Sequence, residues 1–310
     1  MSDALSQILD HLRLRGSIYF HTDFHRPWGI KVPAHRNVIR FHMAVQGECL
    51  FRINGVEQNI HLGPKDLIVI PHGKSHEIAD SAESQASDIE ELVATFGFEA
   101  SGALRSGDGL DDRPCKLVCG HFEFEKGASH PLLDALPNYA LLQSGEDMEN
   151  QWFEFAVRFM SSEILSGQSG SNAVVHRLAE IVFIHAIRNH VRKTGDNVGI
   201  LAAILDPRIS SALFRIHQQP GHAWTVHKLA ALAGMSRTTF SEKFRKMVCM
   251  TPLEYVTYWR VQIAKRQLED NRMTLAEIAF AAGYNSEAAF NRAFKRECGV
   301  TPGQLRRKSG

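Results

Sequence analysis

One pattern occurs twice in the last third of the chain. The copies read LAALAGMSRTTFSEKFRKMVCMTP over residues 229–252 and IAFAAGYNSEAAFNRAFKRECGVTP over residues 278–302. In each copy an apolar stretch ends at a glycine, two phenylalanines follow four residues apart, and a basic cluster precedes Thr-Pro. Residues four apart share one face of a helix. The pattern therefore predicts a helix, a tight turn and a second helix, repeated about 50 residues later.

Capping residues support both helical hairpins. Thr225 and Ser236 precede the two helices of the first copy, and Thr274 and Asn285 or Ser286 do so in the second. A glycine at the end of each first helix can adopt the left-handed conformation that leaves a helix. We expect four buried phenylalanines: Phe240, Phe244, Phe290 and Phe294. A long helix over about 252–271 separates the copies.

Charge is distributed unevenly along the chain. Residues 206–310 contain 17 Lys/Arg and 8 Asp/Glu, a net charge of +9, whereas residues 1–205 contain 18 and 26, a net charge of −8. A basic domain is attracted to phosphate, and this attraction supplies much of the affinity for DNA. A generic all-helical domain is the structural alternative, but two hairpins in register within a basic region favour DNA as the partner.

Residues 206–308 resemble the two-motif DNA-binding domain of AraC/XylS transcriptional regulators. In that family the second helix of each motif enters the major groove. The resemblance implies base-reading positions at Thr238, Ser241 and Glu242 in the first motif and at Glu287, Ala288, Asn291 and Arg292 in the second. Arginine and asparagine suit base-edge hydrogen bonds to guanine and adenine. We expect phosphate contacts or solvated surface at Arg237, Arg245 and Lys295.

One residue departs from the repeat. Cys249 stands where the second copy has Gly299. We therefore expect a changed turn after the first of the two recognition helices.

The N-terminal half has a different pattern, of short alternating runs separated by turn residues. NVIRFHMAVQG, CLFRING, DLIVIPHG, ATFGFEA and KLVCGHFEFE read as antiparallel strands. GPKDLIVIPHGKSHEI resembles the second motif of the cupin barrel, and FHMAVQG resembles a reduced first motif without its His-x-His. The expected fold class is α+β: an N-terminal cupin-like β-barrel plus helices, and a C-terminal all-α domain with two helix-turn-helix motifs.

Strand parity and the cupin resemblance place three residues on the barrel interior. His42, His76 and Cys119 could converge as a site for Zn²⁺ or another transition metal, completed by one further histidine. The alternative is a pair of core or pocket-lining histidines beside a small buried thiol. The sequence leaves both open.

Two cysteines form a second candidate site. Cys115 and Cys119 share a strand face, but their Cα atoms are about 13 Å apart, which excludes a direct disulfide within a regular strand. The N-terminal block resembles cupin-type AraC regulators that respond to reactive chlorine or other electrophiles. That resemblance makes Cys119, with Cys115 beside it, a candidate redox sensor. A structural thiol is the alternative.

Length and composition predict two domains joined by helices. We expect a cupin-like sensor over 1–130, a helical dimerisation region and linker over 131–205, and the DNA-binding domain over 206–310. No apolar run is long enough for a membrane span, and the start of the chain lacks a signal-peptide core. We therefore expect a cytoplasmic protein with no membrane partner.

The leading hypothesis is a one-component transcription factor. It would bind double-stranded promoter DNA, respond to a small effector, a metal or an oxidant, contact RNA polymerase, and form a homodimer through its helices. The rival hypothesis is a metal-dependent cupin enzyme with an added DNA-binding module, which the single histidine of the first cupin motif disfavours. A non-specific nucleoid protein is a third hypothesis. Metal analysis with an oxygen-uptake assay tests the enzyme, and competition between promoter and random DNA tests the third.

Overall fold

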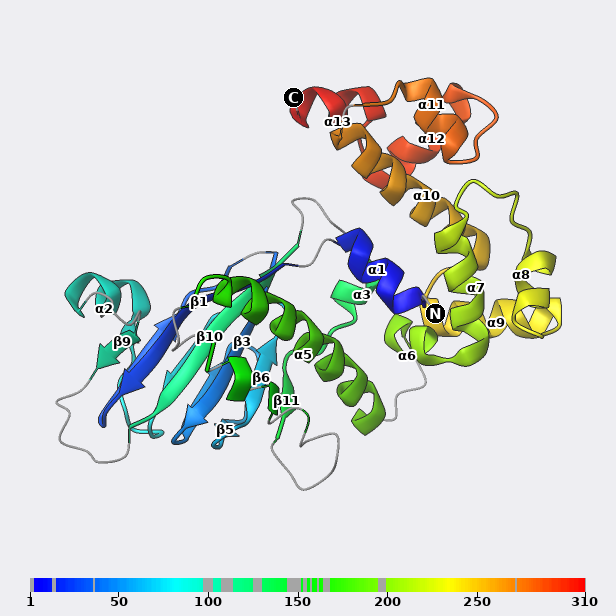
Figure 1. The fold of residues 1–310 in the computed structure, drawn as a ribbon. Coiled ribbons are helices and arrows are strands. Elements are labelled where there is room, and N and C mark those ends of the chain that lie inside the picture. The colour runs from blue at the N-terminus through cyan, green and yellow to red at the C-terminus, as the bar shows by residue number, and fades with distance from the viewer. Residues whose placement is uncertain are drawn as a thin grey trace. The chain divides into compact units, whose positions relative to one another are not determined.

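The chain divides into two compact units in this computed structural model (Figure 1). The structure describes residues 3–309 apart from 13, 14, 36, 97–102, 107–113, 125–129, 144–151, 153, 154, 157, 161, 164–167, 195–198 and 271. The β unit comprises residues 13–128 and 136–195. The helical unit comprises residues 1–12, 129–135 and 196–310.

Two sheets build the β unit. The first has the order β11-β6-β3-β10-β1-β9, and the second has the order β5-β4-β7-β2-β8. The strands of the first sheet are β1 (Arg15–Phe24), β3 (Val38–Gln46), β6 (Leu67–Ile70), β9 (Ala103–Ser106), β10 (Lys116–Glu123) and β11 (Ala140–Leu142). Those of the second are β2 (Gly29–Val32), β4 (Cys49–Ile53), β5 (Ile60–Leu62), β7 (His76–Ala79) and β8 (Ser87–Asp88).

The core of the β unit contains the inward-facing side chains of both sheets. Along β4 buried and half-buried residues alternate, as expected for a strand with one covered face. By contrast, β3 is buried almost throughout, because the long helix α5 (Ser171–Thr194) covers the other face of the first sheet. On that face Phe183 of α5 packs on Phe122, with 5.0 Å between ring centroids, and Phe122 packs on Phe41.

One glycine of the predicted cupin motif is required by close packing. Gly73 has a φ of +56°, and a Cβ atom there would lie 2.0 Å from the carbonyl oxygen of His35. A larger residue would have to displace backbone. The motif glycine thus lets the turn between β6 and β7 approach the preceding loop.

One predicted strand is wrong in its described part. The segment ATFGFEA begins within the helix α2 (Ile89–Phe96), and residues 97–100 lie outside the described residues. Two glutamates in the first turn of α2 favour the helix N-terminus, and its apolar residues follow helical spacing. A short apolar run is compatible with a strand and with a helix, and for this segment the sequence had suggested a strand.

The helical unit contains short helices around one long one. It consists of α1 (Ala4–Leu12), α3 (Pro131–Asp134), α6 (Ile200–Leu205), α7 (Pro207–Gln218), α8 (Val226–Leu232), α9 (Arg237–Val248), α10 (Pro252–Glu269), α11 (Leu275–Ala281), α12 (Glu287–Cys298) and α13 (Pro302–Ser309). The expected α+β class is confirmed. The predicted domain boundaries at 130 and 205 assigned α1 and residues 129–135 to other parts of the chain. In the structure these segments pack with the C-terminal helices.

Candidate nucleic-acid interface and buried polar row

The first predicted motif is formed by α8 and α9. Thr225 caps α8 by accepting a hydrogen bond from the backbone N–H of Lys228 at 3.2 Å, and Ser236 caps α9 in the same way. Between the helices Gly234 has a φ of +60°. Phe240 and Phe244 are fully buried, as predicted, so the opposite face of α9 is turned outward.

The second motif, α11 and α12, repeats this geometry. A reciprocal capping box of Thr274 and Glu277 begins α11, and Ser286 caps α12. Gly283 adopts a φ of +79°, and a Cβ atom there would lie 2.5 Å from the carbonyl oxygen of Gly221. Phe290 and Phe294 are fully buried. The predicted duplication is therefore confirmed as two helix-turn-helix units joined by α10.

Most of the predicted DNA-contacting side chains are solvent-exposed. In α9 these are Arg237, Thr238, Glu242 and Arg245, and in α12 they are Glu287, Ala288, Arg292 and Lys295. Ser241 and Asn291 are half-buried. The two recognition helices thus present comparable outer faces, each with basic residues in its last turn. Base reading by these residues stays a prediction.

Some polar groups on α9 bond within the helical unit. The hydroxyl of Ser241 donates to the carbonyl oxygen of Arg237 at 2.9 Å, so it retains only acceptor capacity for a base. Lys243 donates to Asp206 at 2.5 Å, and Asp206 also caps α7. Burial acts to raise the pKa of Asp206, but the hydrogen bonds from Lys243 and two backbone N–H groups hold it below its ordinary value. Lys243 therefore anchors α9 to α7.

The turn after α9 is not altered by Cys249. This residue adopts the left-handed conformation, with a φ of 60°, and Gly299 adopts it after α12 with a φ of 72°. Both backbone N–H groups close the same hydrogen bond to the preceding turn. The expectation of a changed turn was wrong, since the non-glycine residue accepts the backbone strain.

In the β unit, the three predicted interior residues form a hydrogen-bonded row. His42 Nδ1 lies 3.1 Å from Cys119 Sγ, and His42 Nε2 lies 2.8 Å from His76 Nε2. His42 and Cys119 face each other across the β3–β10 ladder, and His76 comes from β7 of the other sheet. The first two side chains are fully buried and His76 is 3 % exposed. Their predicted proximity is confirmed.

The proton positions along this row follow from its outer end. His76 Nδ1 lies 2.9 Å from the carbonyl oxygen of Lys74, which can only accept, so Nδ1 carries the proton. His76 Nε2 then accepts from His42 Nε2–H, and His42 Nδ1 accepts from the thiol of Cys119. Burial lowers the pKa of His42 well below its ordinary value and that of His76 to about 4, so both rings are neutral at pH 7.

This arrangement does not place three donors around one point. The two nitrogens of His42 face opposite partners, so a metal between the histidine Nε2 atoms would leave Cys119 on the far side of the ring. No group of three or more His, Cys, Asp or Glu side chains in the described part of the chain is arranged to hold a metal. The residues do not fit one metal as they stand, and metal binding stays a prediction.

Three thiols share the core of the β unit. Cys49, Cys115 and Cys119 are buried, and burial raises the pKa of Cys119 well above its ordinary value. Burial also raises the pKa of Cys49, and the neighbouring thiol of Cys115 adds to this. The sequence had paired Cys115 only with Cys119 and missed Cys49. Reactive cysteines are usually exposed and low in pKa, so in this conformation the thiols are protected. The sensor role of Cys115 and Cys119 stays a prediction.

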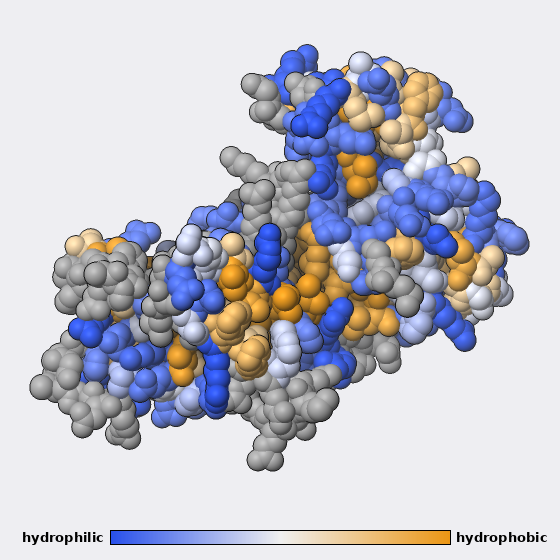
Figure 2. All heavy atoms as spheres, in the orientation of Figure 1, coloured by the Kyte–Doolittle hydropathy of each residue, from blue (hydrophilic) through white to orange (hydrophobic). Residues whose placement is uncertain are grey.

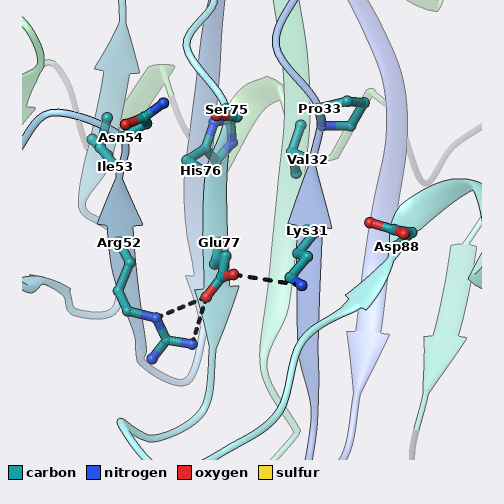
Figure 3. A pocket seen from close by; sticks show the side chains of 10 residues that line it. All are labelled: Lys31, Val32, Pro33, Arg52, Ile53, Asn54, Ser75, His76, Glu77 and Asp88. Atoms are coloured by element: carbon teal, nitrogen blue, oxygen red, sulfur yellow. Dashed lines mark hydrogen bonds and ion pairs between the residues drawn. The ribbon is translucent and has the colours of Figure 1, made fainter.

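A surface pocket of about 400 Å³ opens beside His76, at the start of β7 (Figure 3). His76, Ile53 and Val32 line it beside polar side chains of neighbouring strands. Along one wall, Glu77 accepts a 2.9 Å hydrogen bond from Arg52 Nε and forms ion pairs with Arg52 Nη2 at 2.9 Å and with Lys31 at 4.0 Å. Sequence reasoning placed His76 but not this wall, because the charged residues belong to three strands whose pairing it did not predict.

Comparison with known proteins identifies both parts of the chain. A family model described as Cupin matches residues 3–192, and one described as Helix-turn-helix domain matches residues 229–308. An AraC-like transcription regulator of Streptomyces antibioticus is 32% identical over 98% of each chain. The RCS-specific transcriptional activator RclR of Escherichia coli K-12 is 27% identical over 99% of this chain and 98% of its own.

A solved structure matches the C-terminal part alone. The DNA-binding domain of AdpA, a global transcriptional factor, in complex with a target DNA is 31% identical to this chain. The match covers 33% of this chain and 92% of that one, with a TM-score of 0.31. The full-length relatives and both family models agree with the two helix-turn-helix units and the two-sheet unit described above. The chain belongs to the AraC-type DNA-binding transcriptional regulators that carry an N-terminal cupin domain.

Proposed function

We propose that this regulator couples occupancy of its cupin domain to the reading of two adjacent major-groove segments. The observation that carries the proposal is the repeated geometry of α9 and α12. Each helix has the same cap, the same buried phenylalanine pair and an exposed outer face. Two such helices suit segments about one helical turn, roughly 34 Å, apart on one face of DNA.

We assign side chains to base or phosphate contacts according to their chemistry. Arg292 is exposed on α12 and suits a guanine edge, and the half-buried Asn291 suits adenine. Glu242 on α9 can accept from a cytosine amino group. Arg237, Arg245 and Lys295 supply phosphate contacts, which fix position without reading sequence.

We place the effector site at the pocket beside His76. Its volume is within the range of small-molecule sites, and it combines apolar side chains with polar groups. An effector bound there would act on the row that ends at Cys119, and it must favour one conformational state to regulate. An oxidant acting on Cys119 is the second form of this proposal, supported by the similarity of the chain to the RCS-specific activator RclR.

The remaining partners are RNA polymerase and a second copy of the chain. Two aromatic rings, Phe155 and Phe159, are 67% and 40% exposed and stack at 6.1 Å. Ile181 on α5 is also exposed, and Figure 2 shows apolar residues along that helix. We propose a homodimer through this surface, in the cytoplasm, where promoter DNA and polymerase are present. No helix in the described residues is long and apolar enough to cross a membrane.

One experiment separates the two halves of the proposal. Wild-type protein and the variants His76→Ala and Cys119→Ser are compared in a reporter strain exposed to a panel of oxidants, metals and aromatic compounds. DNA affinity is measured in parallel by fluorescence anisotropy. We expect both variants to bind DNA like the wild type and to lose or change the response to an inducing compound. Full responses from both variants would contradict the sensor site.

Metal and catalysis are tested on the same purified protein. Elemental analysis of the wild type and of His76→Ala tests whether a metal is present and depends on that histidine. An oxygen-uptake assay tests the rival enzymatic hypothesis. We expect no turnover, because the row contains only two buried histidines, His42 and His76. The first cupin motif contributes only one of them, His42.

A further inference from the structure

Three segments that are far apart in the sequence meet at one hydroxyl group inside the helical unit. The Tyr255 hydroxyl lies 3.1 Å from His130 Nε2 and 2.7 Å from His217 Nε2. Tyr255 is on α10, His217 on α7, and His130 caps the short helix α3. All three side chains are buried. We call them the His130–Tyr255–His217 node.

The hydrogen bonds of the node determine which of its atoms carry a proton. His130 Nδ1 accepts the backbone N–H of Leu132 at 3.0 Å, so the proton of this neutral ring is on Nε2. His130 therefore donates to the Tyr255 oxygen, and the Tyr255 hydroxyl donates to His217 Nε2. Burial, with a smaller effect of neighbouring histidines, lowers the pKa of both rings, which keeps them neutral. The hydroxyl is thus used as donor and acceptor at once.

Tyr255 lies where α10 carries the first motif. The centroid of its ring is 5.9 Å from that of Phe244 on the recognition helix α9. His217 packs on Trp259 of α10, with 4.0 Å between the ring centroids. The second motif packs further along α10, where Val261, Ala264 and Leu268 form a core with Phe290 and Phe294. Both helix-turn-helix motifs therefore pack on the same helix, α10. A change of tilt at Tyr255 changes their separation.

In the sequence, His130 belongs to a segment that separates the two stretches of the β unit. It follows β10, which ends at Glu123 and contains Cys119, and it lies in the segment 129–135 that packs with the helical unit. In the other direction along the chain, α1 precedes β1 and packs on α7 (Figure 1). The ring centroids of His11 on α1 and Trp259 on α10 are 4.8 Å apart, with the rings tilted by 54°. In the sequence, α1 therefore precedes β1 and residues 129–135 follow β10, and both segments belong to the helical unit.

We propose that His130 and Tyr255 are positioning residues, which set the tilt of α10 and hence the spacing of the two recognition helices. This rests on the proposed function, in which α9 and α12 read DNA together. Neither residue touches DNA. They affect simultaneous DNA binding by both helix-turn-helix motifs. When the second motif is misplaced, its linkage to the first no longer raises the affinity.

The test uses full-length protein and two duplexes. The first is the sequence that wild-type protein selects from random DNA, and the second is the same duplex with one of its two blocks scrambled. Tyr255→Phe removes only the hydroxyl, and His130→Asn keeps a capping oxygen for Leu132 but is too short to reach Tyr255. Tyr284→Phe is the matched control, since the Tyr284 hydroxyl has no hydrogen-bond partner in the described residues.

We expect both node variants to bind the two-block duplex about tenfold more weakly and the one-block duplex within twofold of wild type. Tyr284→Phe should match wild type on both duplexes. Equal losses on the two duplexes would indicate general destabilisation, and no loss would show that the node does not position α10; either result overturns the inference. Circular dichroism checks folding, and His130→Asn decides the matter if Tyr255→Phe is unfolded. If wild-type protein selects no sequence, it is the proposed function that fails.

Discussion

Acidification should destabilise the helical unit through His217. Burial and the charge of His11 lower the pKa of His217 to about 3, whereas an unfolded chain has a histidine pKa near 6.5. Below pH 6.5 the unfolded state therefore binds a proton that the folded state does not, and stability falls as pH falls. The loss begins at the unfolded pKa and continues to the folded one. Between pH 7.5 and 5.0 it amounts to about 2 kcal/mol for this residue.

The variant His217→Gln isolates this contribution, because an amide oxygen can accept from Tyr255 but does not titrate. Urea unfolding at both pH values gives the free energies, and hydrogen exchange of peptides from α10 assigns the transition to the helical unit. The stability advantage of wild type over His217→Gln should shrink by about 2 kcal/mol at pH 5.0. The exposed His227→Gln is the control. An advantage that stays constant within about 0.5 kcal/mol would refute the burial argument.

Four further predictions concern single side chains. Arg292→Ala should lose about 1–3 kcal/mol on the selected duplex in anisotropy titrations, and an equal loss on random DNA would make Arg292 only a phosphate contact. Phe244→Ala should cost about 3–5 kcal/mol in urea unfolding of the helical unit; a variant as stable as wild type would contradict the packing of α9. Cys249→Gly should stabilise by about 1 kcal/mol, since it relieves a left-handed non-glycine residue, and unchanged stability argues against that strain. Iodoacetamide should label the exposed Cys249 well before the buried Cys119, as read by mass spectrometry; similar rates would show that the thiol is not protected.

The helical motifs were predictable because their signals are local. A cap, a glycine and a phenylalanine pair each act within one or two turns of helix, so α8, α9, α11 and α12 follow from spacing alone. Strand parity likewise placed His42 and Cys119 on one interior, because side chains alternate strictly along β3 and β10. The cupin resemblance added His76. These predictions needed no knowledge of how distant segments pack.

The remaining features depend on tertiary packing. Nothing local to His130 or His217 indicates that both bond one hydroxyl of α10, since the contact spans 125 residues from His130. The donor directions of His42 also depend on its rotamer, so parity could suggest a metal site but not show a hydrogen-bonded row. The run at 94–100 was ambiguous for a different reason: a short apolar stretch suits a strand and a helix equally.

Selection of binding sites from a random duplex library shows whether α9 and α12 read DNA together. Full-length protein should enrich one sequence with two conserved blocks about one helical turn apart, as two linked reading heads require. Footprinting of the enriched duplex should protect both blocks on one face. Enrichment of a single block, or of no sequence at all, would contradict an account in which α9 and α12 read DNA together.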